Sequence, residues 1–224
     1  MADSPDQPGR LGGRMAKDRA PRLLVFCVLV LAAAVLIVGA VDIFKLIARN
    51  STPTTGPDLR LRFLEGVVRH QPEEYESRRE LAFAYQQAGR EREALREYGR
   101  VLKARPNDLA SLYNTGLIHL GSSRRGKGEK ALLRVLELAP SHSLAAKALG
   151  DHYAEAGDYR RVLAVVVPAM DAHPELADLQ YLAGLAYEKT GQRSRAQSSY
   201  HRAVLLMPDM KAAERGLKRV GGVK

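Results

Sequence analysis

The 224-residue chain has one cysteine, Cys27, and no tryptophan. A single cysteine cannot close a disulfide within the chain, so an internal disulfide framework is excluded. The six histidines stand at none of the spacings typical of a zinc site, and no Cys-x-x-Cys-His motif for covalent haem occurs. No Ser-His-Asp or paired-carboxylate arrangement stands out either. We therefore predict no metal, no cofactor and no enzymatic activity.

Charge is missing from one long stretch near the N-terminus. The 19 residues Leu23–Val41 carry no charged side chain, and a helix of that length spans about 28 Å, close to the hydrocarbon core of a bilayer. We predict a transmembrane helix over residues 23–47, with lipid contacts along Leu23–Ile47. A cleaved signal peptide is the alternative, because Val38–Ala40 has the small residues of a cleavage site.

The segment before this helix, residues 1–22, is predicted to be disordered because it has few large apolar residues. It is also basic, with these positive residues: Arg10, Arg14, Lys17, Arg19 and Arg22. The positive-inside rule then places the N-terminus in the cytoplasm and the rest of the chain on the extracytoplasmic side of a cell membrane. Residues 48–57 are predicted to be a short polar linker.

Five prolines recur at a fixed interval of 34 residues: Pro72, Pro106, Pro140, Pro174 and Pro208. A fixed period in this range indicates a repeat architecture. Because proline lacks an N–H and disfavours helix in the residue before it, the spacing predicts a helix that stops at the same point in each unit.

Other positions repeat in the same register. Eight residues before the prolines stand large side chains: Leu64, Tyr98, Leu132, Val166 and Tyr200. Small residues recur earlier in each unit: Ala82, Gly116, Gly150 and Gly184. This pattern resembles the tetratricopeptide repeat over residues 75–210.

The resemblance implies an all-α fold, a right-handed α-solenoid of four helix hairpins. The units are residues 75–108, 109–142, 143–176 and 177–210. A half-repeat helix over residues 58–72 is expected to cap one end of the stack, and a helix over residues 211–224 the other.

In the family, the first helices of the units line a groove that binds a protein or peptide. The resemblance therefore implies a partner site at Arg79, Phe83, Tyr113, Asn114, Leu117, Lys147, Asp151, Tyr181 and Leu185. The net charge of +10 does not indicate nucleic acid, because the charges are interleaved as on solvated helix faces.

We predict a membrane-anchored interaction scaffold, assembly factor or chaperone, outside the cytoplasm of a bacterium. Cytochrome c maturation, translocon-associated and envelope complexes are examples of its setting. One alternative is an organelle-membrane receptor with repeats facing the cytosol. Another is a nucleotide-binding enzyme that uses the basic turn of residues 121–130, where Gly121–Lys127 spells GxxxxGK. Because no Ser or Thr follows and no strand is expected before it, we favour a loose, flexible turn.

Overall fold

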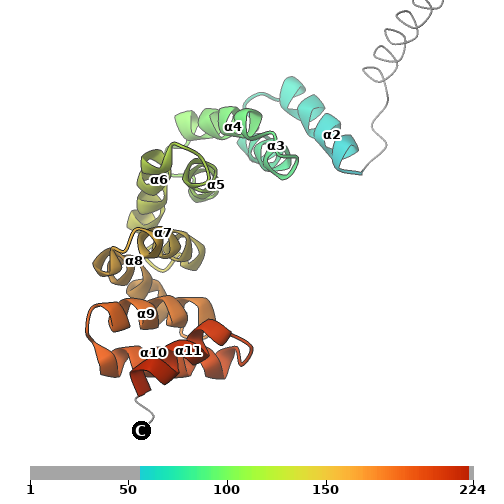
Figure 1. Ribbon diagram of the computed structural model, residues 1–224. Coiled ribbons are helices and arrows are strands. Elements are labelled where there is room, and N and C mark those ends of the chain that lie inside the picture. Colours follow the sequence, from blue (N-terminus) through green and yellow to red (C-terminus); the bar gives the residue numbers. More distant parts are fainter. Residues whose placement is uncertain (1–55, 222–224) are drawn as a thin grey trace, which may run out of the picture. The chain divides into compact units, whose positions relative to one another are not determined.

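The computed structural model describes residues 56–221, which form ten α-helices and contain no strand (Figure 1). The all-α prediction is thus confirmed for this part of the chain. The predicted N-terminal segment 1–22, the transmembrane helix 23–47 and most of the linker 48–57 lie outside it. None of the helices in residues 56–221 is long and apolar enough to cross a membrane.

The helices fall into hairpins with a helix at either end. In chain order they are α2 (Gly56–His70), α3 (Tyr75–Gln87), α4 (Glu91–Ala104), α5 (Leu109–Leu120), α6 (Arg125–Leu138), α7 (Ser143–Glu155), α8 (Tyr159–Ala172), α9 (Ala177–Lys189), α10 (Arg193–Leu206) and α11 (Lys211–Gly221). Each helix packs against the next one, and the first helices α7 and α9 also touch, as do α9 and α11. This chain of neighbour contacts is the construction of a solenoid.

Local sequence sets where the helices stop. The second helix of each hairpin ends two residues before one of the 34-residue prolines, as α4 does at Ala104 before Pro106. Within three hairpins, the turn holds a glycine in the left-handed region, with φ of 71° at Gly89, 76° at Gly157 and 78° at Gly191. Glycine adopts this conformation without a Cβ penalty, so it ends the first helix and reverses the chain.

Each hairpin is closed by a small residue on the first helix against a large residue on the second. A Cβ added at Gly150 would lie 2.7 Å from Val166 Cγ2, and one at Gly184 would lie 2.8 Å from the Tyr200 ring. The large residues are completely buried. The small column therefore lets the two helices approach closely enough for the large side chains to fill the space between them.

The predicted loose turn in the second hairpin is wrong. Helix α6 already begins at Arg125, so half of the glycine-rich stretch is helical. Gly128 is buried, and a Cβ there would lie 2.6 Å from the Leu120 backbone nitrogen and 2.7 Å from the Gly116 carbonyl oxygen. The glycine is thus needed for close contact between α5 and α6, and the connection itself is short.

Candidate peptide-binding face

All nine predicted site residues lie on first helices. They are Arg79 and Phe83 on α3; Tyr113, Asn114 and Leu117 on α5; Lys147 and Asp151 on α7; and Tyr181 and Leu185 on α9. We call the surface formed by these four helices the first-helix face. Its side chains differ in how far they are free to contact a partner.

Arg79 connects the first hairpin to the second. Its guanidinium lies 3.0 Å from the carboxylate of Asp108, the residue that caps the N-terminus of α5 by accepting a hydrogen bond from the Ser111 amide at 2.8 Å. Burial acts to raise the pKa of Asp108, but the Ser111 hydrogen bonds and the Arg79 charge outweigh it and hold that pKa below its ordinary value. Arg79 therefore already has a structural partner.

Tyr113 makes the equivalent connection one hairpin later. Its ring centroid lies 5.4 Å from that of His142, whose Nδ1 caps α7 by accepting a hydrogen bond from the Ala145 amide at 3.2 Å. Tyr113 also packs against the main hydrophobic core, and burial raises the pKa of its hydroxyl. Its stacking with His142 holds successive first helices together along the face.

Lys147 is paired within its own helix, α7. Its ammonium donates to the Asp151 carboxylate at 2.8 Å, and this hydrogen bond raises the pKa of Lys147 against the opposing effect of burial. Lys147 and Asp151, both on α7, are the two predicted site residues that this ion pair brings together.

The remaining predicted residues range from exposed to core-packed. Phe83 is 41% exposed, whereas Tyr181 and Leu185 pack against the core, with the Tyr181 ring 6.1 Å from that of Tyr200. The Asn114 amide donates to the Ala110 carbonyl at 2.9 Å, within its own helix. Leu144 of α7, with 57% exposure, adds a large apolar contact beside the predicted ones.

The sequence prediction missed Asp108 and His142 as members of this face. The sequence did contain a signal for them, because each stands two residues after one of the five regularly spaced prolines, where a helix N-cap is expected. Their links to Arg79 and Tyr113 needed the structure, since each joins a first helix to the N-cap of the next first helix, 29 positions along the chain.

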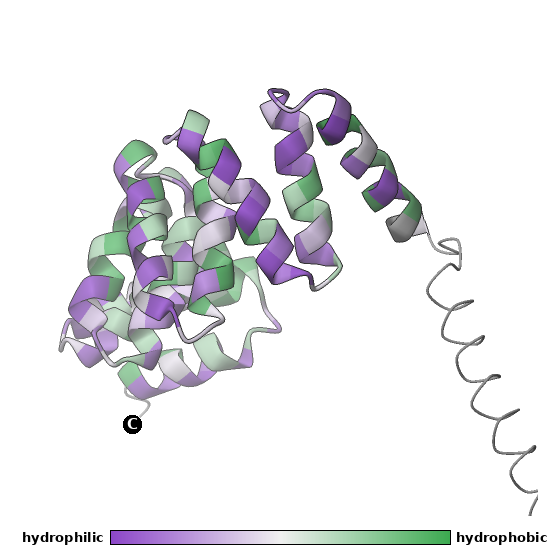
Figure 2. Cartoon of the chain, turned by 90° about the horizontal axis from the view of Figure 1, so that it is seen from above, coloured by the Kyte–Doolittle hydropathy of each residue, from purple (hydrophilic) through white to green (hydrophobic). Residues whose placement is uncertain are grey.

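Charge is divided between the two sets of helices. The four second helices (α4, α6, α8 and α10) contain 13 Lys and Arg against 6 Asp and Glu, a net charge of +7. The four first helices contain 4 Lys and Arg against 6 Asp and Glu, a net charge of −2. Hydrophobic positions alternate with hydrophilic ones along the helices (Figure 2). The first-helix face is thus weakly acidic and partly apolar.

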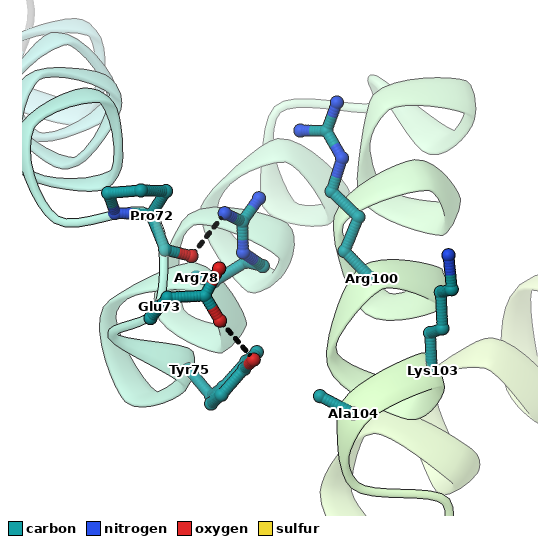
Figure 3. Close-up of a pocket in the computed structure, with 7 residues that line it drawn as sticks. All are labelled: Pro72, Glu73, Tyr75, Arg78, Arg100, Lys103 and Ala104. Carbon is teal, nitrogen blue, oxygen red and sulfur yellow. Dashed lines mark hydrogen bonds between the residues drawn. The ribbon is translucent and has the colours of Figure 1, made fainter.

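A cavity of about 400 Å³ lies apart from this face, between the α2–α3 turn and α4 (Figure 3). It has three basic lining residues, Arg78, Arg100 and Lys103. Arg78 is engaged, because it donates to the Glu97 carboxylate at 2.7 Å and to the Pro72 carbonyl at 2.5 Å. This buried pair joins α3 to α4, so the basic lining of the cavity serves the packing of the first hairpin. Among residues 56–221, no group of three His, Cys, Asp or Glu is placed to hold a metal ion.

The basic turn offers no phosphate-binding loop. Lys127 and Gly128 lie in the first turn of α6, and the element before them is helix α5. A phosphate-binding loop requires a strand at that place. The strand that the nucleotide-binding alternative requires is therefore replaced by a helix.

Comparison with known proteins identifies the repeat. The sequence model of the tetratricopeptide repeat family matches residues 177–210, which is the fourth predicted unit. A search of curated protein sequences gave no match. Among solved structures, a MamA fragment from Desulfovibrio magneticus RS-1 is 24% identical, with a TM-score of 0.59 over 66% of this chain and 84% of that one.

A second solved structure agrees with the first. A tetratricopeptide repeat protein from Parabacteroides merdae ATCC 43184 is 15% identical, with a TM-score of 0.59 over 71% of this chain and 64% of that one. Identities this low show a shared fold. Together with the match at residues 177–210 and the 34-residue hairpins described above, they show that residues 177–210 are a tetratricopeptide repeat and that the described helices have the fold of tetratricopeptide repeat structures.

Proposed function

We propose that this protein is a membrane-anchored scaffold that holds a segment of another protein along its first-helix face. The observation that carries the proposal is this weakly acidic face on successive first helices, with Phe83 and Leu144 exposed at 41% and 57%. Phe83 and Leu144 stand on α3 and α7, two units apart, and offer separate apolar anchors for an extended segment. The partner that fits best is an apolar segment with a few basic residues, because the face has a net negative charge.

The anchor is the apolar segment 23–47, with the basic residues before it in the cytoplasm and the repeats on the extracytoplasmic side of a bacterial membrane. Support for this comes from sequence alone: the uncharged run Leu23–Val41 and the basic cluster that precedes it. Protease treatment of intact cells tests the orientation. If the repeats are extracytoplasmic, opening the outer barrier should make them cleavable while the anchoring membrane is still intact. Protection of the repeats at that stage would favour the cytosol-facing alternative.

The binding face is tested by charging an exposed contact. Phe83→Glu is expected to reduce crosslinking to the partner in native membranes at least about tenfold, as for loss of an interface anchor. Leu205→Glu is the matched control, because Leu205 is 67% exposed on the second helix α10. Equal crosslinking by the two variants would remove the first-helix face from the site.

Charging Tyr113 tests the same face less cleanly. Tyr113 packs on the core and stacks on His142, so Tyr113→Glu is expected to lower the melting temperature as well as capture. Phe83 is the better position, since it is 41% exposed and takes no part in the links between hairpins described above. Circular dichroism of each variant separates loss of binding from loss of fold.

A further inference from the structure

Helix α2 has two apolar faces. One is formed by Leu61, Leu64 and Val68, which are buried in the core that α2 shares with α3 and α4. The other contains Leu59 and Phe63, which are 58% and 70% exposed. These two residues are four positions apart and therefore stand one above the other on the helix. We call this second surface the outer face of α2.

The outer face occupies a place that the hairpins cover. Counting by the 34-residue period, Phe63 corresponds to Glu97 on α4, Ala131 on α6, Val165 on α8 and Ser199 on α10; Ala131 is half-buried and the other three are buried. In the first hairpin this position points to the partner helix, since Glu97 pairs with Arg78 of α3. The residues that the structure describes include no helix before α2, so Phe63 has no such cover.

Positive charge borders the outer face. Arg60, Arg62 and Arg69 are all exposed on α2, and a recess of about 420 Å³ lies between Arg62, Phe63 and His70. Glu65 is engaged on the other side, where it accepts a hydrogen bond from the Tyr85 hydroxyl at 2.7 Å and lies 3.8 Å from Arg90. An aromatic and a leucine flanked by arginines are the side chains of helices that lie in a membrane interface.

We propose that the outer face of α2 docks on the anionic headgroup surface of the membrane in which the chain is anchored. This rests on the anchor of the proposed function. The predicted span ends at Ile47, and the eight residues 48–55 that separate it from α2 reach at most about 30 Å when extended. The tether supplies a high effective concentration of lipid, so two apolar side chains and three arginines suffice for docking.

The charge pattern decides between lipid and a polypeptide as the occupant. Each arginine near an anionic membrane surface favours docking by about fivefold, whereas an exposed arginine at the rim of a protein contact adds little. Lipid headgroups satisfy both the arginines and the apolar side chains at once.

A single fluorophore tests the proposal, because the chain has no tryptophan. The full-length Phe63→Trp variant is reconstituted in nanodiscs with zwitterionic or anionic lipid. In anionic discs we expect blue-shifted emission and strong quenching by brominated lipids. The matched control is Phe83→Trp, an exposed position on the first-helix face, which should show neither change.

Adding Arg60→Gln and Arg62→Gln to the Phe63→Trp variant should lower the docked-to-undocked ratio in anionic discs by about twentyfold to thirtyfold, at about fivefold for each charge. Equal quenching of the Phe63→Trp and Phe83→Trp variants in anionic discs would overturn the proposal. A blue shift that depends on protein concentration and not on lipid would assign the face to a second copy and overturn it as well. Failure of the chain to remain with native membranes after carbonate washing refutes the anchor separately, before the fluorescence is interpreted.

Discussion

The two ends of the described stack are completed in different ways. At the α2 end, the outward surface shows Leu59 and Phe63. The polar links from this helix to the first hairpin run from Glu65 to the Tyr85 hydroxyl at 2.7 Å and to Arg90 at 3.8 Å. At the α11 end, the outward residues are basic: Lys211, Arg215, Lys218 and Arg219. The α11 end has the polar surface that a terminal helix of a solenoid needs in water, and the α2 end does not.

The α11 end is also more tightly joined. Gly216 lies directly against the Tyr200 ring, and the Tyr200 hydroxyl donates to Glu188 at 2.6 Å while Arg219 donates to the same carboxylate at 2.8 and 2.9 Å. The difference between the ends shows that stacking and surface chemistry are separate requirements. An end helix can be packed by its inner face and still present a second surface to a different environment.

The largest expected effect on stability comes from removing the buried ion pair of the first hairpin, next to α2. Arg78→Leu removes the hydrogen bonds to the Glu97 carboxylate and the Pro72 carbonyl and leaves Glu97 only the partly exposed Arg100, at 2.7 Å. The free energy of unfolding should fall by about 1.5–3 kcal/mol. Combining it with Glu97→Val should recover most of this, because the corresponding pair in the third hairpin, Ala146 and Val165, is buried and apolar. Urea unfolding of the full chain in mild detergent measures both. A double variant as unstable as the single one would contradict this account of the pair.

A pair of glycine substitutions sharpens the comparison of the two ends. A Cβ at Gly216 would lie 2.6 Å from Tyr200 Cε1, whereas nothing lies within 4 Å of one at Gly66. Gly66→Ala should therefore stabilise α2 by about 0.5–1 kcal/mol through helix propensity. Gly216→Ala should destabilise the α11 end by about 1–2 kcal/mol, because overpacking exceeds that gain. Opposite shifts in melting temperature are expected, and shifts of the same sign would refute the close contact.

The smallest expected effect is the part of the acid dependence of stability that Glu188 contributes at the α11 end. The hydrogen bonds from Arg219 and then Tyr200 outweigh burial and hold the pKa of Glu188 below its ordinary value of 4.5. A lowered folded-state pKa adds stability above the unfolded-state pKa, and this is lost as pH falls through the folded value. Glu188→Gln should thus flatten the loss of stability below pH 4.5, by under about 1 kcal/mol because Arg219 is partly exposed.

Arg219→Gln serves as the matched variant for this measurement. It removes the two Arg219 hydrogen bonds and leaves the one from Tyr200, so it should flatten the pH profile less than Glu188→Gln does. The double variant should behave like Glu188→Gln alone, because the Arg219 interaction is already lost there. Additive effects would show that Glu188 acts through some other contact.

Sequence reasoning succeeded for the hairpins because their packing rule is local and repeated. A small residue such as Gly150 and a large one such as Val166 recur in fixed register, and each unit needs the pair to close. The same reasoning failed at Gly121–Gly128, where a glycine-rich stretch suggested a loose turn. A glycine serves equally in a flexible turn and in a close contact, and only its neighbours distinguish the two.

The candidate site was predictable in its placement and not in its details. The predicted residues do lie on the first helices, since the repeat register assigns each one to a helix. Their availability depends on contacts between hairpins, such as Arg79 with Asp108 and Tyr113 with His142. These contacts join residues whose distance is set by how one hairpin stacks on the next.

The sequence by itself determined the period, the hairpins and the buried columns, because proline, glycine and the alternation of small and large residues act within one unit. Only the tertiary structure decided which side chains are engaged in contacts with a neighbouring helix and which are exposed. The exposure of Phe63 is the clearest case, since the corresponding positions in α4, α8 and α10 are buried. Whether a residue is covered depends on a neighbouring helix, and a repeat pattern specifies the unit without specifying what lies beside the first one.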